Sequence, residues 1–171
     1  MLAIIAISIA LGFVLILFLK RTTSNIAAEP GFYSAQEDLE TRSLRTLGPE
    51  EFEFLLQQLL EEMGLRVIES EWVNEREIDI RARNPQPLIG ADYIVHGILV
   101  PEGEVVGSPR VIGLSDTVRA ERAAKGILIT TGFFSEETAK YQEGAPLELI
   151  NLPRFKELLK QHHILWPLAT E

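Results

Sequence analysis

Residues 125–135 read KGILITTGFFS, and this stretch decides the fold class. Residues 126–130 form a short continuous apolar run, which is typical of a strand buried on both faces of a sheet. Ser135 can then cap a helix that is predicted to end at residue 141, with two glutamates in its first turn. A buried strand followed directly by a capped helix indicates an α/β fold.

The segments on either side of this stretch extend the same pattern in both directions. The predicted helices cover residues 49–63, 109–124, 135–141 and 153–162, and the predicted strands cover residues 65–68, 77–83, 93–100, 126–130 and 147–150. Residues 101–108 are predicted to form a turn region. The order of these elements predicts an α/β sandwich with a mixed central sheet flanked by helices.

The first of these helices has the clearest periodicity. Its apolar residues recur at the spacing of one helix face, and they are Phe52, Leu55, Leu56, Leu59, Leu60 and Met63. Pro49 stands where its missing N–H costs nothing, and Gly64 marks the C-terminal stop. We therefore expect this helix to cover one face of the sheet.

The N-terminal residues have the composition of a membrane segment. Residues 2–19 contain no charged side chain, and as a helix they would span about 27 Å, close to the hydrocarbon thickness of about 30 Å. We predict a transmembrane anchor over residues 1–21. The alternative is a cleaved signal peptide, which needs basic residues before the apolar run and a small-residue cleavage site after it. Lys20 and Arg21 instead follow the run, and residues 27–28 (Ala-Ala) are a weak cleavage candidate.

Positive charge accumulates on the cytoplasmic side of membranes. Lys20 and Arg21 therefore predict a single-pass protein of the cell membrane with its soluble domain in the cytoplasm. Residues 22–46 are predicted to be a linker with a short helix near residues 34–44. The folded domain is predicted to cover residues 47–163.

Residues 164–171 form a predicted C-terminal tail, in which Trp166 and Pro167 act as an apolar latch on the domain. The adjacent pair His162 and His163 is interpreted as a solvated helix end and not as a metal site.

The chain is acidic, with 16 basic and 25 acidic residues and a net charge of −9. When Lys20 and Arg21 are assigned to the membrane edge, 14 basic residues remain and the rest of the chain carries about −11. Proteins that bind nucleic acid usually neutralise phosphates with Lys and Arg, so this balance argues against nucleic acid as the main partner. A solvated acidic surface explains it directly. No cysteine is present, which excludes disulfides and thiolate metal sites.

Five segments together resemble the Mrr-like restriction endonucleases of the PD-(D/E)xK superfamily, over about residues 47–160. They are LGPEEFEFL at residues 47–55, MGLRV at 63–67, IDI at 78–80, KGILITTGFFS at 125–135 and LELIN at 147–151. The resemblance implies a restriction-endonuclease-like core and metal-dependent hydrolysis of phosphodiesters. In that reaction Mg²⁺ supplies Lewis acidity and a water nucleophile, and a lysine stabilises the attacking hydroxide.

The residues implied by the resemblance are only partly present. Glu53 matches a helix Glu of the family, and Asp79 matches its metal-binding Asp. The family's Gln-x-Lys on the third strand falls on His96 and Ile98, and an isoleucine cannot donate a hydrogen bond or stabilise charge. The glycine-rich turn before the Asp is replaced by the bulky, charged residues 74–77 (Asn-Glu-Arg-Glu). We therefore expect no catalytic residue and no bound metal, with Asp79 as the ligand if any metal binds.

Two basic residues bear on the missing lysine. Arg81 lies two residues beyond Asp79, hence on the same strand face, and we hypothesise that it pairs with Asp79 and fills the vacated cation position. Lys125 is the nearest lysine in sequence, but it stands at the mouth of another strand.

His96 has three interpretations. It is a core residue with one satisfied nitrogen, or a metal ligand together with Asp79, or the remnant of a polar pocket.

Two functions remain open at this point. The first is a membrane-anchored, catalytically inactive nuclease-like module that needs no cofactor, contacts membrane lipid and assembles with other membrane-protein subunits. The second is a membrane-tethered, Mg²⁺-dependent deoxyribonuclease with a rearranged site that uses Glu53, Asp79 and His96.

Overall fold

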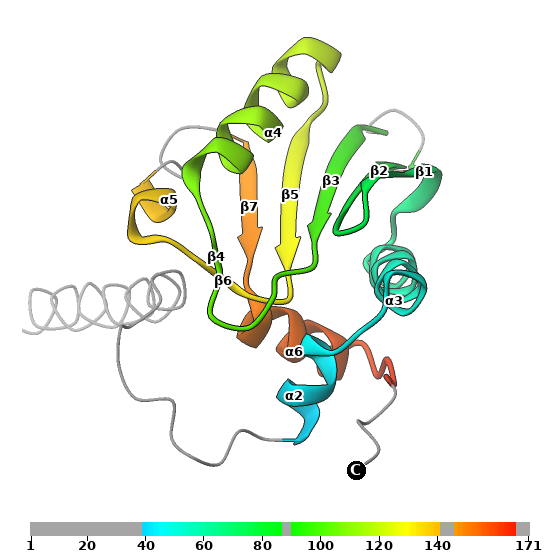
Figure 1. Cartoon of the computed structure of the whole chain (residues 1–171). Helices are drawn as coiled ribbons and strands as arrows, with labels where there is room; N and C mark the ends of the chain where they lie inside the picture. Colours follow the sequence, from blue (N-terminus) through cyan, green and yellow to red (C-terminus); the bar gives the residue numbers. More distant parts are fainter. Residues whose placement is uncertain (1–38, 87–89, 141–145, 167–171) are drawn as a thin grey trace, which may run out of the picture.

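The computed structural model describes residues 39–86, 90–140 and 146–166. The helices in these residues are α2 (Leu39–Arg45), α3 (Pro49–Glu62), α4 (Ser108–Glu121), α5 (Glu136–Lys140) and α6 (Leu152–Gln161). The strands are β1 (Arg66–Asn74), β2 (Glu77–Arg83), β3 (Asp92–Ile98), β4 (Val105–Val106), β5 (Lys125–Thr130), β6 (Phe133–Phe134) and β7 (Leu147–Ile150). Figure 1 shows their arrangement.

A five-stranded sheet with the order β1-β2-β3-β5-β7 forms the centre of the domain. The pairs β1–β2 and β2–β3 are antiparallel, whereas β3–β5 and β5–β7 are parallel. This confirms the predicted α/β fold with a mixed central sheet flanked by helices. The short strands β4 and β6 pair in parallel as a separate two-stranded sheet, which was not predicted.

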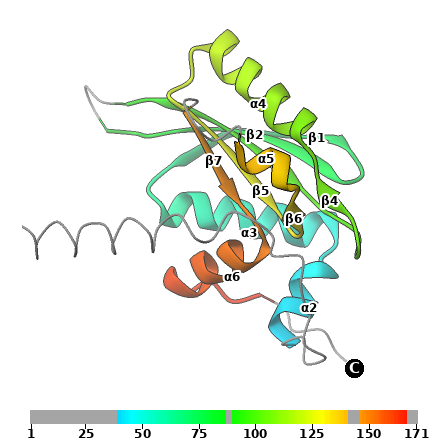
Figure 2. The ribbon, with the colours of Figure 1, turned by 90° about the vertical axis from the view of Figure 1, so that its left-hand side faces the viewer.

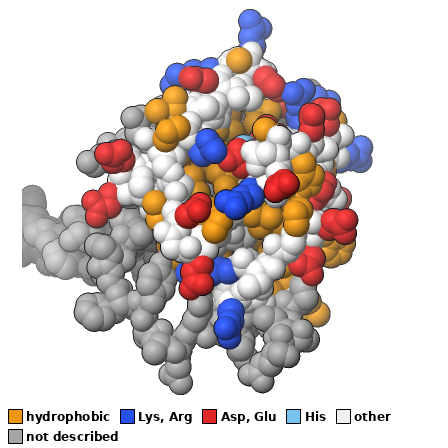
Figure 3. Space-filling view, in the orientation of Figure 1, with side chains coloured by type: hydrophobic (Ala, Val, Ile, Leu, Met, Phe, Trp, Pro, Cys, Tyr) orange, Lys and Arg blue, Asp and Glu red, His pale blue; other side chains and the backbone are white. Residues whose placement is uncertain are grey.

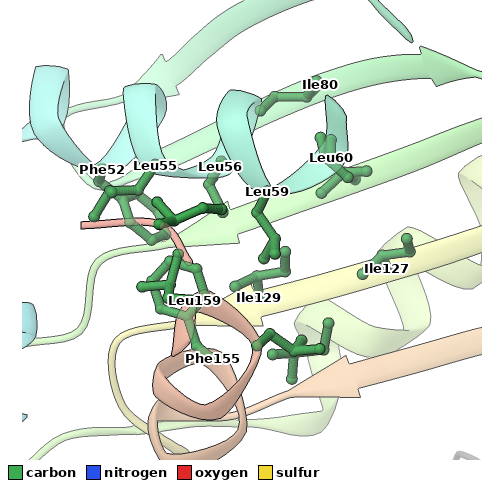
Figure 4. Close-up of a cluster of buried hydrophobic side chains, with 14 of the residues drawn as sticks. Phe52, Leu55, Leu56, Leu59, Leu60, Ile80, Ile127, Ile129, Phe155 and Leu159 are labelled. Carbon is green, nitrogen blue, oxygen red and sulfur yellow. The ribbon is translucent and has the colours of Figure 1, made fainter. Parts of the chain in front are cut away.

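Helices cover both faces of the sheet, with α3 and α6 on one side and α4 on the other (Figure 2). The first face holds the larger core, in which Phe52 and Phe155 pack edge to face with ring centroids 6.0 Å apart. Figure 4 shows the side chains of α3 and α6 directed towards Ile127 and Ile129 of β5. On the second face, Val111, Leu114 and Val118 of α4 pack on the sheet.

A missing side chain on β3 allows α3 to approach the sheet closely. A Cβ atom at Gly97 would lie 2.6 Å from Leu56, 2.8 Å from Ile78 and 3.0 Å from Phe52. The helix itself begins at Pro49 as predicted, and the Glu51 carboxylate accepts a hydrogen bond of 2.9 Å from the Gly48 N–H. This capping contact satisfies a backbone donor before the helical bonds begin.

The folded unit includes residues of the predicted linker. α2 lies near the expected short helix, and Leu44 is fully buried in the core of the α3 face. Thr41 accepts a hydrogen bond of 2.8 Å from Lys156 of α6. The indole of Trp166 packs against the same core and donates to Ser43 Oγ at 3.0 Å, so this part of the expected latch contacts α2. Pro167 lies outside the described residues.

β1 is longer than expected, because it continues to Asn74 where the sequence predicted a strand ending at residue 68. β1 is an edge strand of the sheet. Its residues Glu69 and Glu71 line a hollow on the α4 side and are not covered by the core, so these positions need not be apolar. Apolar alternation, which the sequence prediction required, is therefore absent from this part of the strand.

No helix within the described ranges is long and apolar enough to cross a membrane. The predicted anchor over residues 1–21 lies outside those ranges, as do residues 22–38 of the predicted linker and residues 167–171 of the predicted tail.

Candidate functional site

The central strands β2 and β3 bring three of the positions implied by the resemblance, Asp79, His96 and Ile98, together on one face of the sheet. Their register pairs Asp79 with His96 and Glu77 with Ile98. Alternate residues of a strand point to the same face. The buried Ile78 lies against the α3 core, so Glu77, Asp79, His96 and Ile98 face α4.

Asp79 and His96 bind each other. The imidazole Nδ1 of His96 makes a short hydrogen bond to Oδ1 of Asp79. The Asp79 side chain is 54% exposed, whereas that of His96 is only 14% exposed. The other ring nitrogen, Nε2, is buried without a hydrogen-bond partner in the described part of the chain, and the Glu77 carboxylate lies 3.9 Å from it. One ring nitrogen of His96 is thus bonded and the other is not, and the ring lies beside the carboxylates of Asp79 and Glu77.

Ile98 fills the lysine position with apolar surface. Its side chain is 6% exposed and belongs to the core beneath α4, together with Ile94, Val106 and Phe134. A buried aliphatic group cannot hold a hydroxide or a phosphate oxygen.

Arg81 does not pair with Asp79, so the hypothesis that it fills the vacated cation position is wrong. Its guanidinium instead contacts Glu121 at 2.8 Å and 2.9 Å. The sequence could not reveal this competitor, because Glu121 follows 40 residues later and reaches the site only through the packing of α4 on the sheet.

Glu53, the match to the helix Glu of the family, lies on the opposite face of the sheet. It accepts hydrogen bonds from Trp72 Nε1 at 2.7 Å, from Ser70 Oγ at 2.5 Å and from Gln57 Nε2 at 3.0 Å. Ser70 and Trp72 are the cross-strand partners of Ile80 and Ile78, which face α3. The Glu53 carboxylate therefore joins α3 to the edge strand β1, and it is separated from Asp79 by the sheet.

Glu77 and Arg110 form an ion pair that the sequence analysis missed. The Nε and Nη2 atoms of Arg110 lie 2.8 Å and 2.5 Å from Glu77 Oε1. The Glu77 side chain is only 14% exposed. Its position opposite Ile98 follows from the strand register, but the arrival of an arginine from α4 has no local signal in the sequence.

Two hollows flank this row of residues. The larger has a volume of about 310 Å³ and lies between the end of β3, β4 and the start of α4, with Ile98, Glu77 and Arg110 in its wall. The smaller, of about 140 Å³, is lined by Glu69, Glu71, Asp79, Ile80, Arg81, Ile94, Thr117 and Glu121. Figure 3 shows acidic and basic side chains interspersed over one face of the molecule, with apolar side chains between them.

Carboxylates line the smaller hollow, but within the described part of the chain they do not form a metal-binding cluster. Among the described residues, no group of three or more His, Asp or Glu side chains could hold a metal ion. Lys125 is bound by Glu148 of the neighbouring strand β7 and stands away from Asp79.

A further ion pair, between Arg83 and Asp92, joins the end of β2 to the start of β3. Arg83 donates to Asp92 from Nε at 2.6 Å and from Nη2 at 3.2 Å. This hydrogen bonding holds the pKa of the Asp92 carboxyl below its usual value and raises the pKa of Arg83.

The chain matches the family model Mrr_cat, described as "Restriction endonuclease", over residues 44–159. The chain belongs to this restriction endonuclease family. The match begins at Leu44, which is the residue of α2 that is buried in the core. The matched residues run from the end of α2 into α6 and include Asp79 and Ile98. No curated protein matches the sequence.

Solved structures of restriction endonucleases have a similar fold. The DNA modification-dependent restriction endonuclease AspBHI aligns with a TM-score of 0.55 and 18% identity, over 79% of this chain and 40% of that chain. The MspJI restriction endonuclease in complex with a 27-mer oligonucleotide aligns with a TM-score of 0.49 and 20% identity, over 75% of this chain and 35% of that chain. This chain thus corresponds to less than half of either enzyme.

Proposed function

We propose that the domain is a restriction-endonuclease-like module without hydrolytic activity, which acts by binding as an assembly or accessory subunit of a membrane protein complex. The observation that carries this proposal is the buried Ile98, because it occupies the third-strand position where the family has its lysine. A hydrolytic site of this class needs a cation beside the metal-bound water.

The engagement of the remaining site residues supports the same proposal. Asp79 is held by His96, and Glu53 is held by Ser70 and Trp72 on the far side of the sheet. The side chains that matched the family's acidic residues thus make contacts within the domain.

The location and partners belong to the same proposal. Residues 1–21 anchor the chain in membrane lipid, and the basic pair at residues 20–21 directs the domain to the cytoplasm. The apolar helix packs laterally against other membrane-protein subunits, and the acidic domain contacts their cytoplasmic face. The net charge of −9 argues against DNA as the partner, and this binding role needs no cofactor.

A membrane-tethered, Mg²⁺-dependent deoxyribonuclease with a rearranged site is the second candidate. Membership of the restriction endonuclease family favours this candidate. The Asp79 side chain, which is 54% exposed and lines a hollow with Glu69 and Glu71, favours it as well. AspBHI is described as modification-dependent, so methylated DNA is a suitable substrate for the test.

A cleavage assay with the full-length protein in mild detergent separates the two candidates. Methylated and unmethylated supercoiled plasmid are incubated with Mg²⁺ or Mn²⁺ and with the wild type, Asp79→Ala or Asp116→Ala. Asp116 is an exposed carboxylate of α4 and provides the matched control. We expect no cleavage above a mock purification with any of the three proteins. Cleavage that Asp79→Ala abolishes and Asp116→Ala retains would overturn the proposal in favour of the nuclease.

A further inference from the structure

Four charged or polar side chains lie in a row along the α4 face of β2 and β3, and hydrogen bonds join them in two pairs. Arg110 of α4 binds the Glu77 carboxylate through two nitrogens, at 2.8 Å and 2.5 Å. The second oxygen of Glu77 lies 3.9 Å from His96 Nε2, and His96 Nδ1 binds Asp79. Basic and acidic groups therefore alternate from the start of α4 to the middle of β2.

The position of Glu77 connects this row to the missing lysine. Glu77 and Ile98 are direct cross-strand partners, and the Cβ atoms of such partners lie about 4.5–5.5 Å apart. An ammonium group carried by residue 98 would therefore reach the Glu77 carboxylate. The guanidinium of Arg110 on α4 contacts that same carboxylate. Arg110 and Glu77 both line the hollow of about 310 Å³.

We propose that Arg110 supplies the positive charge that residue 98 no longer carries, and that Glu77 holds it in place. A carboxylate as shielded as Glu77, which is 14% exposed, requires a charged or hydrogen-bonding partner. The inference deepens the proposed function, since it explains how the polar groups around a lost lysine are neutralised by one another. Arg110 is a positioning residue of this network.

A double-mutant cycle between positions 98 and 110 tests the inference. The melting temperature of the full-length protein in mild detergent is measured for Arg110→Met, Ile98→Lys and the double variant. We expect Arg110→Met to lower it by about 5 °C, because Glu77 loses its partner. Ile98→Lys should be tolerated better in the Arg110→Met background, with a fall at least about 3 °C smaller, because the new ammonium then has Glu77 to itself.

Arg119→Met provides the matched control on the same helix. Its ion pair with Asp116 is 3.7 Å long, and both side chains are largely exposed. We expect this variant to change the melting temperature by less than about 2 °C and to show no coupling with Ile98→Lys. If the effects of Ile98→Lys and Arg110→Met add within about 2 °C, Arg110 does not occupy the charge position and the inference fails.

A second cycle keeps the inference testable if Ile98→Lys does not fold. Arg110→Met is made in a Glu77→Gln background, where the carboxylate that needs a partner is gone. We expect the effect of Arg110→Met to shrink to that of the Arg119→Met control, and an undiminished effect would overturn the inference. Both cycles are measured without DNA or metal. DNA cleavage by the wild type would thus refute the proposed function alone, whereas additive cycles would refute the role of Arg110 alone.

Discussion

The replacement of Glu53 by alanine separates a structural role of this residue from a catalytic one. Glu53 matches a helix residue of the nuclease family, yet its carboxylate accepts hydrogen bonds from Ser70, Trp72 and Gln57. We expect Glu53→Ala to reduce the free energy of unfolding by about 2–4 kcal/mol. Two of these bonds, from Ser70 and Trp72, join α3 to β1. Hydrogen bonds to a charged acceptor contribute about 1.5–3 kcal/mol each, and at the lower end, which applies to this partly buried group, two of them account for about 3 kcal/mol.

Glu53→Gln should show a smaller loss of about 1–2 kcal/mol, because one carbonyl oxygen remains to accept a hydrogen bond while the charge is lost. Glu61→Ala removes an exposed carboxylate from the same helix and should change stability by less than about 0.5 kcal/mol.

Urea unfolding followed by circular dichroism measures these differences. Tryptophan fluorescence in a Trp166→Phe background, where Trp72 is the one indole left, reports the local contact. A loss below about 0.5 kcal/mol for Glu53→Ala would refute the reasoning, since the carboxylate would then not hold β1 to α3.

Three further substitutions follow from single contacts, and each is measured as a change in stability. Gly97→Ala should cost about 1–3 kcal/mol, because the added methyl group would lie 2.6–3.0 Å from three side chains of the core. Trp166→Phe should cost about 1 kcal/mol through loss of the hydrogen bond to Ser43, and an unchanged stability would show that this hydrogen bond contributes nothing. The pKa of Asp92 is lowered in the folded state by Arg83, so this carboxylate stabilises the domain above its ordinary pKa and the contribution is lost as the pH falls. Asp92→Asn should therefore be less stable than the wild type near neutral pH, and the difference should shrink below about pH 4; a difference independent of pH would contradict this.

The sequence predicted those features of the fold that depend on local periodicity. The apolar face of α3 was recognisable from its helical period, and the strands β5 and β7 were recognisable from short apolar segments. The polar edge strand β1 was predicted too short, since its acidic residues point into a hollow and break the apolar alternation. The short pair β4 and β6 has too few residues for any period.

The site was predictable in position but not in its contacts. The resemblance located Asp79, His96 and Ile98, and the register of β2 with β3 brings them together. The partners of the charged groups were not predictable, because Glu121 and Arg110 reach the site from α4 across long sequence separations. The alternation of a strand shows which side chains lie on the same face of the sheet. The packing of α4 on that face determines which ion pairs those side chains form.

Mn²⁺ binding to the full-length protein, measured by isothermal titration calorimetry, tests the central claim most directly. The claim is that the polar groups remaining at the nuclease site bind one another. We predict that the wild type and Asp79→Ala give the same titration, with only the weak binding expected of an acidic surface. A saturable Mn²⁺ site that is present in the wild type and lost in Asp79→Ala would contradict the claim.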